Sequence, residues 1–346
     1  VAAVPFRAVA QPEGKTMSHR VIAKTGESLP VIGLGTWQTF DVGTSAAARA
    51  PLAEVLTAFF ESGGRLLDSS PMYGRSEAVV GDLVSELKVP APFLATKVWK
   101  SGREAGIRQM EQSFARLRTR RLDLLQVHNL VDVATHTKTL QAWKAEGRVR
   151  YIGITHYAAG AHAEVERWLK TGAYDFLQIN YSLAERQAER RLLPLAEEKR
   201  VAVIINRPFA EGALFTRIKG KPLPSWAQEF GAQSFAQLFL KWILGHKAVT
   251  CVIPATAKLA HARDNLEAGS GAHVGDAVAH GAGADHRDRG QGRGGHGARV
   301  YSAPSRSRGT KKTPGPRRLR RLFFFSRALV SGQCEEGDSN PHRSPR

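Results

Sequence analysis

The sequence has little cysteine and no long apolar run. It contains two cysteines in 346 residues. Cys251 lies in the apolar run VTCVI, which predicts a buried thiol, and Cys334 lies near the C-terminus. This excludes a disulfide framework, and no metal-ligand spacing is present, so we expect no metal site. No apolar stretch is long enough to cross a bilayer as a helix, which excludes a protein built on such helices.

The sequence also lacks a glycine-rich phosphate turn after its first apolar run. That run, Val31–Thr36, ends in GLGT, which does not have the G-x-G-x-x-G spacing. Open, doubly wound sheets that bind dinucleotides normally carry this turn after their first strand. The absence therefore argues against such a sheet.

Eight short apolar runs, rich in Val, Ile and Leu, alternate with stretches of helical period. Runs of this kind are typical of strands buried on both faces. They are Val31–Thr36, Arg65–Asp68, Phe93–Lys97, Leu122–Val127, Val149–Ile154, Phe176–Ile179, Val201–Ile205 and Val249–Ile253. Eight strand–helix units in roughly 250 residues predict an α/β fold, a (β/α)8 TIM barrel.

The basic charge of the chain is concentrated in its last part. The net charge is +19, and residues 270–346 contribute +9 of it together with 13 of the 33 glycines. This stretch has few large apolar side chains and no helical period, so we expect a disordered tail or out-of-frame translation. Its basic and aromatic segment Arg317–Phe325 raises nucleic acid or lipid as a partner. The mixed charges of the body favour neither, and we expect no nucleic-acid or membrane partner.

Residues 1–19 are expected to form an extension before the barrel. The chain begins VAAVPFRAVA, where Ala8 and Ala10 have the A-x-A spacing that ends an export signal. The alternative is upstream read-through before a start at Met17. We expect the barrel over residues 20–269, as a monomer in the cytoplasm, or in the periplasm if the export signal is genuine.

Polar, titratable residues stand at the ends of three expected strands. Asp68 and Lys97 end two of them, His128 follows a third, and Tyr73 lies five residues after Asp68. In a barrel these strand ends meet at the face that carries the active site. Lys97 can lower the pKa of the Tyr73 phenol, and Asp68 can hold Lys97 in place. His128 can hydrogen-bond a substrate carbonyl or relay the proton. The polarised carbonyl would then accept a hydride that only a cofactor can supply.

Five segments resemble, in this order, the signature segments of the aldo-keto reductase family. They are VIGLGTWQ (Val31–Gln38), the stretch Asp68–Glu77 that ends in PMYGRSE, TKVW (Thr96–Trp99), VHN (Val127–Asn129) and IPATAKLAHARDN (Ile253–Asn265). The resemblance runs from about Arg20 to Gly269. It implies NADPH-dependent reduction of an aldehyde or ketone, with NADH as the alternative cofactor. It also implies a catalytic tetrad of Asp68, Tyr73, Lys97 and His128, with Tyr73 as the proton donor.

The same resemblance implies how the cofactor is held. Thr155, His156 and Gln178 would hold the nicotinamide carboxamide. The Asn206–Phe215 loop would cover the pyrophosphate, and Ile253–Asn265 would hold the adenosine phosphates. The expected cofactor-binding residues are Gly35, Thr36, Trp37, Thr155, His156, Gln178, Asn206, Arg207, Pro208, Phe209, Ile253, Ala255, Thr256, Lys258, His261, Asp264 and Asn265.

Two positions depart from the family pattern. The family commonly stacks an aromatic ring on the nicotinamide at the position of Asn206, so either Tyr181 or Trp37 substitutes or the cofactor is held less firmly. Ala255 stands where a lysine often grips the adenosine 2′-phosphate. The cations nearby in the sequence are Lys258, His261 and Arg263. We therefore expect a preference for NADPH.

Two other classes of function stay open. One is a non-catalytic, cofactor-binding subunit that senses redox state, and the other is a nucleic-acid-associated protein acting through the basic tail. Occupation of all four tetrad positions favours the enzyme. Trp37 and Trp99 either line a substrate pocket or only pack at the barrel rim.

Overall fold

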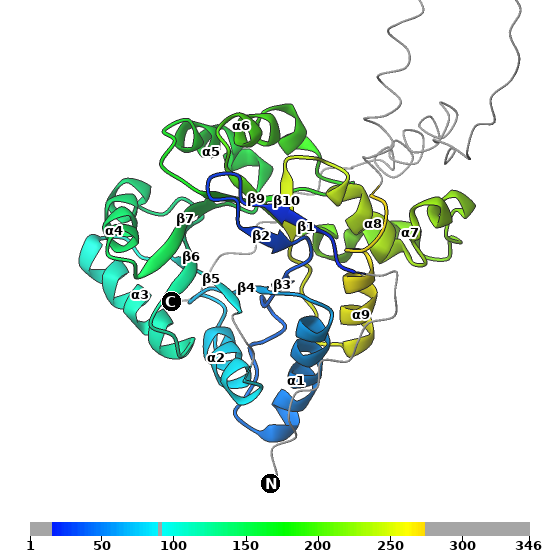
Figure 1. The fold of residues 1–346 in the computed structure, drawn as a ribbon, viewed down its shortest axis with the longest axis horizontal. Helices are drawn as coiled ribbons and strands as arrows, with labels where there is room; N and C mark the ends of the chain where they lie inside the picture. Colours follow the sequence, from blue (N-terminus) through cyan, green and yellow to red (C-terminus); the bar gives the residue numbers. More distant parts are fainter. Residues whose placement is uncertain (1–15, 89–91, 274–346) are drawn as a thin grey trace, which may run out of the picture. The chain divides into compact units, whose positions relative to one another are not determined.

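Eight parallel strands form the centre of the computed structural model, which describes residues 16–88 and 92–273 (Figure 1). They are β3 (Leu34–Gly35), β4 (Leu66–Asp68), β5 (Phe93–Val98), β6 (Leu122–His128), β7 (Val149–Thr155), β8 (Phe176–Asn180), β9 (Ala202–Asn206) and β10 (Val249–Val252). They pair in sequence order. The ring closes where Gly33 N–H donates to Val252 O over 2.8 Å and Val252 N–H donates to Val31 O over 2.9 Å. The expected (β/α)8 barrel is confirmed, with a strand in each of the eight apolar runs.

Helices surround these strands (Figure 1). They are α1 (Ala46–Glu61), α2 (Ser76–Glu86), α3 (Arg103–Arg116), α4 (Val133–Ala145), α5 (His162–Leu169), α6 (Leu192–Glu198), α7 (Ala213–Ile218), α8 (Phe235–Leu244) and α9 (Leu259–Glu267). Two of these helices begin at a serine N-cap. The side chains of Ser45 and Ser234 accept hydrogen bonds from backbone N–H groups at the starts of α1 and α8. The helices bury one apolar face each against the strands, as Met110 and Phe114 of α3 do.

The barrel interior is layered along the strands. Side chains in a strand alternate between its two faces, so every second residue points inward. Near the N-terminal ends the inward set is apolar and includes Leu66, Phe93 and Cys251, and the burial of Cys251 confirms the expectation. Asp68 lies two residues after Leu66 on the inward face of β4, and Lys97 lies four residues after Phe93 on the inward face of β5. The polar layer is therefore carried at the carboxyl ends of the strands.

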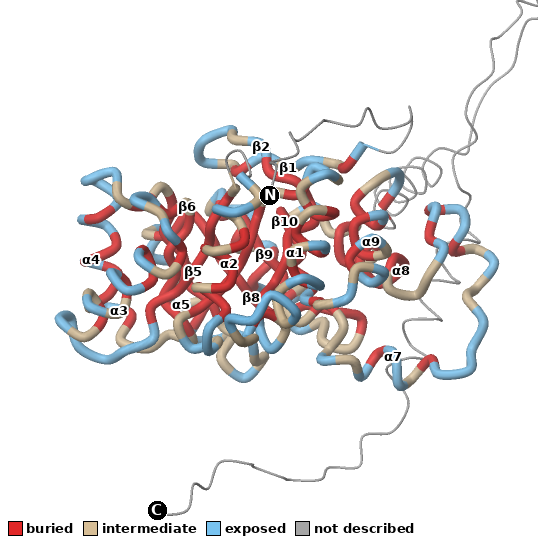
Figure 2. Tube along the Cα trace, turned by 90° about the horizontal axis from the view of Figure 1, so that it is seen from below, coloured by how far each residue is buried: buried red, intermediate tan, exposed pale blue. Residues whose placement is uncertain are grey.

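A hairpin that the sequence did not predict covers the N-terminal end of the barrel. Its strands are β1 (His19–Val21) and β2 (Ser28–Pro30), which pair antiparallel. Ile22 and Leu29 of this hairpin are fully buried in the apolar cluster inside the barrel. Figure 2 shows the hairpin on the opposite side of the molecule from α7. The hairpin closes this end, which leaves the carboxyl ends of the strands for a site.

The folded body reaches slightly beyond residues 20–269 at both ends. Met17 forms a bridge with Ser270, and Ser18 N–H donates to Gly269 O over 2.7 Å. Lys241 Nζ donates to Ser270 O and, over 3.3 Å, to Ala272 O. The remainder of the two expected extensions, residues 1–15 and 274–346, lies outside the described residues. Among the helices that the structure describes, none is long and apolar enough to cross a membrane.

Candidate active site

The structure brings the four residues of the expected tetrad together. Asp68, Lys97 and His128 lie at the carboxyl ends of β4, β5 and β6, and Tyr73 lies in the turn before α2. Lys97 Nζ lies 2.6 Å from Asp68 Oδ2 and 5.1 Å from the centre of the Tyr73 ring. The Tyr73 and His128 rings are nearly perpendicular, at 81°, with centres 5.9 Å apart. The Tyr73 phenol, the Lys97 ammonium and the His128 imidazole therefore lie close together.

The ion pair of this site is buried, since the Lys97 and Asp68 side chains are 0% and 3% exposed. Burial lowers the pKa of Lys97, but attraction to Asp68 and Tyr73 outweighs this effect and raises that pKa, so the amine stays charged. Burial raises the pKa of the Tyr73 phenol, and Lys97 acts in the opposite direction. The sequence predicted only the second effect. The net result is a phenol that keeps its proton near neutral pH.

His128 is a neutral imidazole. Burial, and then repulsion from Lys97 and His156, lower its pKa to about 2. One ring nitrogen of a neutral imidazole donates a hydrogen bond and the other accepts one. Ser70 Oγ lies 3.1 Å from His128 Nδ1, and both side chains are buried. His128 can therefore serve as a hydrogen-bond donor but not as a cation.

Two buried glutamines support Asp68. Gln178 Nε2 donates to Asp68 Oδ1 over 2.8 Å, and Gln126 Nε2 donates to the same oxygen over 3.4 Å. Thr155 Oγ1 in turn donates to Gln178 Oε1 over 3.1 Å. Sequence reasoning assigned Gln178 to the cofactor and missed Gln126. The sequence did contain an indication that Gln126 belongs to the site. Gln126 stands two residues before His128, so both side chains point to the same side of β6.

The turn that carries Tyr73 is held by the loop after β3. Gly74 has φ +59°, and a Cβ at this position would lie 2.2 Å from Asp41 Oδ2. Asp41 Oδ1 accepts the Arg75 backbone N–H over 3.0 Å and its guanidinium over 3.3 Å. Thr36 Oγ1 also donates to Asp68 O over 3.0 Å. Sequence reasoning missed Asp41, which is 32 residues from Tyr73 and has no motif of its own.

The residues expected around the nicotinamide lie at the ends of β7, β8 and β9. Asn206 Nδ2 donates to His156 O over 3.3 Å, and Asn206 Oδ1 is buried without a hydrogen-bond partner among the described residues. Tyr181 cannot stack above this site. It is 2% exposed, its hydroxyl donates to Glu189 over 2.7 Å, and its ring packs on Trp242. The expectation that Tyr181 substitutes for the missing ring is wrong, because Tyr181 follows Asn180 and so points out of the barrel.

The loop after β9 begins with three of the expected cofactor residues, Arg207, Pro208 and Phe209. Arg207 Nη1 donates to Tyr157 O over 3.3 Å, and its guanidinium forms ion pairs with Glu185 and Glu211 at 3.7 and 3.5 Å. The Phe209 ring packs on Phe215 of α7, with centres 5.0 Å apart. Arg207 therefore connects the loops after β7, β8 and β9, where the expected pyrophosphate site lies.

Basic residues stand at the N-terminus of α9. Lys258 is the N-cap residue, and Lys258 and His261 are exposed and form no ion pair with the part of the chain that the structure describes. Arg263 is two residues beyond His261 and so faces another side of the helix. The Asp264 carboxylate accepts hydrogen bonds from Ser234 Oγ over 2.7 Å and from Gln237 Nε2 over 2.8 Å. Asp264 ties α9 to α8.

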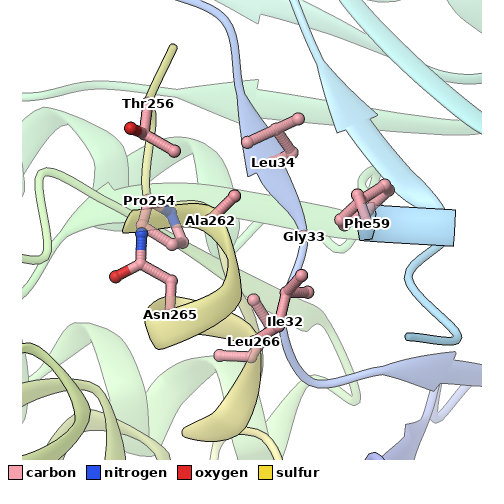
Figure 3. A pocket seen from close by; sticks show the side chains of 9 residues that line it. All are labelled: Ile32, Gly33, Leu34, Phe59, Pro254, Thr256, Ala262, Asn265 and Leu266. Atoms are coloured by element: carbon pink, nitrogen blue, oxygen red, sulfur yellow. The ribbon is translucent and has the colours of Figure 1, made fainter. Parts of the chain in front are cut away.

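A small pocket lies behind the barrel wall between β3, α1 and α9 (Figure 3). It has room for about one water molecule. Its lining residues are Ile32, Gly33, Leu34, Phe59, Pro254, Thr256, Ala262, Asn265 and Leu266. None belongs to the tetrad, and the space is too small for a substrate. Gly35, beside it, is needed for packing, because a Cβ there would lie 2.9 Å from Ile253 O.

Exposed rings border the carboxyl ends of the strands. Trp37 and Trp99 are 42% and 40% exposed and follow β3 and β5, and Tyr157 follows β7. The Trp99 ring centre lies 6.4 Å from that of His128. Within residues 16–88 and 92–273, no three histidine, cysteine or acidic side chains gather as metal ligands would. The chemistry available at this site is therefore proton transfer and hydrogen bonding beside apolar surface.

Comparison with known proteins agrees with this geometry. The sequence profile of the Aldo/keto reductase family matches residues 31–276. Methylglyoxal reductase YeaE of Escherichia coli (strain K12) is 30% identical over 259 residues, which cover 72% of this chain and 89% of that protein. The NADH-specific methylglyoxal reductase of the same organism is 24% identical over 276 residues, or 68% and 83% of the two chains.

A solved structure is similar as well. The aldo/keto reductase from Klebsiella pneumoniae in complex with NADP and acetate has a TM-score of 0.63 and 27% identity, and the match covers 77% of this chain and 94% of that chain. The chain therefore belongs to the aldo/keto reductase family, and it is an NAD(P)H-dependent oxidoreductase that acts on carbonyl groups.

Proposed function

We propose that this protein reduces an aldehyde or ketone to an alcohol with NADPH and that Tyr73 is the general acid. One observation carries the proposal. The Tyr73 phenol lies beside the charged, buried Lys97 and the neutral His128, at the carboxyl ends of the strands. A proton donor, a group that stabilises its conjugate base and a second hydrogen-bond donor are the groups that carbonyl reduction needs.

Each side chain has a distinct task in this reaction. A reduced nicotinamide supplies the hydride to the carbonyl carbon when it is bound, because no side chain can. Tyr73 gives its hydroxyl proton to the carbonyl oxygen, and Lys97 stabilises the phenolate that remains. Burial raises the pKa of Tyr73, so the proton is present at neutral pH. Asp68 holds the Lys97 ammonium in place through the 2.6 Å ion pair.

The residues of this chain fit NADPH at two points. Asn206 Oδ1 is buried without a partner among the described residues, and it is an acceptor that a carboxamide N–H would satisfy. Lys258 places positive charge at the N-terminus of α9, and His261 adds a ring N–H group there, where backbone N–H groups also favour a phosphate. The NADP complex of the Klebsiella relative supports this choice. The NADH-specific relative keeps NADH as the alternative.

The comparisons also suggest a first substrate. Two relatives are named as methylglyoxal reductases, which makes a small dicarbonyl the first compound to test. The exposed rings of Trp37 and Trp99 beside the tetrad favour apolar and aromatic aldehydes as the next group. The panel should therefore contain methylglyoxal, a short aliphatic aldehyde, an aromatic aldehyde and a ketone.

Steady-state assays on the full chain test the proposal. Each carbonyl is offered with NADPH and with NADH, and oxidation of the cofactor is followed together with the appearance of the alcohol. We expect turnover of at least one aldehyde, with a higher kcat/KM for NADPH. Tight cofactor binding without turnover of any member would contradict the proposal and favour a redox-sensing role.

A further inference from the structure

We propose that Ser70 is a positioning residue that fixes His128 as the tautomer with its proton on Nε2. In this form His128 donates a hydrogen bond toward the substrate carbonyl. The role of that donor rests on the proposed function, whereas the tautomer itself does not.

The contact between the two residues is short and buried. Ser70 Oγ lies 3.1 Å from His128 Nδ1, and the two residues are 0% and 5% exposed. The position of Ser70 is set by its backbone, since Ser70 O accepts the Tyr73 N–H over 3.0 Å. The turn that carries Tyr73 therefore also carries the hydroxyl that faces His128.

The hydrogen bonds of the Ser70 hydroxyl show which atom carries the proton at this contact. A serine hydroxyl has one proton to donate and two lone pairs that accept. Ser70 Oγ accepts the Met72 N–H over 3.4 Å. Within the described parts of the chain, His128 Nδ1 is the only acceptor within reach of this hydroxyl. Ser70 satisfies its proton only by donating to Nδ1, and Nδ1 must then be unprotonated.

The proton of His128 consequently lies on Nε2. Burial and the nearby Lys97 keep the imidazole neutral, so it carries one N–H. No hydrogen bond from the described residues reaches Nε2. The His128 ring is nearly perpendicular to the Tyr73 ring, with 5.9 Å between centres, and its centre lies 6.4 Å from that of the Trp99 ring. The Nε2 N–H therefore has no partner among the described residues and remains for a carbonyl bound beside Tyr73.

The opposite tautomer would fail in two ways. With the proton on Nδ1, the Ser70 hydroxyl would accept two hydrogen bonds and its own buried proton would have no acceptor. Nε2 would then carry a lone pair, which repels a carbonyl oxygen instead of stabilising the charge that develops there. Ser70 thus makes His128 a donor rather than an acceptor.

Nitrogen-15 NMR of histidine-labelled full-length protein at neutral pH tests this directly. The His128 signals are identified by their absence in His128→Asn, and long-range proton couplings show which nitrogen carries the proton. We expect the wild type to be protonated on Nε2. In Ser70→Ala the Nδ1 resonance should shift, and kcat should fall by about tenfold with the affinity for NADPH unchanged. Ser70→Thr keeps the hydroxyl and should retain the wild-type spectrum.

Ser69→Ala is the matched control. It also removes a buried hydroxyl from the same segment, but that hydroxyl bonds Thr36 Oγ1, at 3.0 Å, and not His128. A wild-type spectrum with the proton on Nδ1 overturns the inference without any variant. A Ser70→Ala spectrum with the same Nδ1 resonance as Ser69→Ala overturns it as well. If the protein reduces no carbonyl, the proposed function fails, and the spectrum still decides the tautomer.

Discussion

The side chain of Gln178 donates a hydrogen bond to Asp68 Oδ1 over 2.8 Å, although the two residues are 110 positions apart. Gln178 lies on β8 and Asp68 on β4, so the bond crosses the barrel interior. The other oxygen of the carboxylate, Oδ2, is taken by Lys97. Both oxygens of Asp68 are therefore satisfied, as a buried carboxylate requires.

This bond leads to a prediction about charge at position 178. Gln178→Glu puts a second carboxylate beside Asp68, and repulsion by Asp68 raises the pKa of the new carboxyl in the folded state. The pKa of this carboxyl is then higher in the folded state than in the unfolded state, where it is about 4. The free energy of unfolding therefore falls as the pH rises above about 4. We expect Gln178→Glu to melt well below Gln178→Leu near neutral pH, with the difference shrinking toward about pH 4. Equal melting temperatures throughout would show that position 178 does not sense Asp68.

Tyr73→Phe should abolish reduction and leave the site otherwise intact. The change removes only the hydroxyl, so the proton donor is lost while the ring keeps its packing near His128. General acid catalysis supplies about 10²–10⁴-fold, and we expect a loss of kcat of that size. Fluorescence titration should show unchanged NADPH affinity. Retention of more than about half the wild-type rate would rule out Tyr73 as the acid.

Lys97→Met should change both pH dependence and stability. Lys97 opposes the effect of burial on the Tyr73 phenol, so its loss raises the pKa of Tyr73 further. The fall of kcat/KM at high pH should therefore move upward. The variant also leaves Asp68 as an unpaired buried charge, which costs about 3–5 kcal/mol of unfolding free energy.

The control for this change is the double variant Lys97→Met/Asp68→Asn. It removes both charges, so it should recover much of the stability but not the activity. An unchanged pH profile in Lys97→Met would show that Lys97 does not tune the tyrosine.

Lys258→Ala should weaken NADPH binding selectively. A contact between an ammonium and the 2′-phosphate contributes about 1.5–3 kcal/mol, which is roughly tenfold or more in Kd. NADH lacks that phosphate and should bind as before. Arg263→Ala is the matched control, because it removes a charge from another side of α9. Equal losses for both cofactors in Lys258→Ala would place the phosphate elsewhere.

Gly74→Ala should lower activity through the turn that holds Tyr73. At φ +59° a side chain costs about 1–2 kcal/mol in backbone strain, and the new Cβ would also meet the Asp41 carboxylate. Asp41→Ala removes that obstacle, so the double variant should be more active and more stable than the two single changes predict together. Urea unfolding and kcat measure this coupling, and strictly additive effects would contradict it.

The sequence by itself determined the barrel and the residues at its strand ends. Strand and helix periods depend on neighbouring residues, so Val31–Thr36 and seven further runs predicted all eight strands. A barrel brings strand ends to one face, which was enough to place Asp68, Lys97 and His128 near one another. The β1–β2 hairpin was missed, because its strands read HRV and SLP and carry no continuous apolar run.

Only the tertiary structure decided which side chains touch. The bonds from Gln178 to Asp68, from Ser70 to His128 and from Asp41 to the Tyr73 turn join separate elements. Their distances depend on strand register and on the curvature of the closed ring, which no local pattern encodes. The same geometry turned Tyr181 outward, where its hydroxyl bonds Glu189, and brought the Asp264 carboxylate to Ser234 at the start of α8.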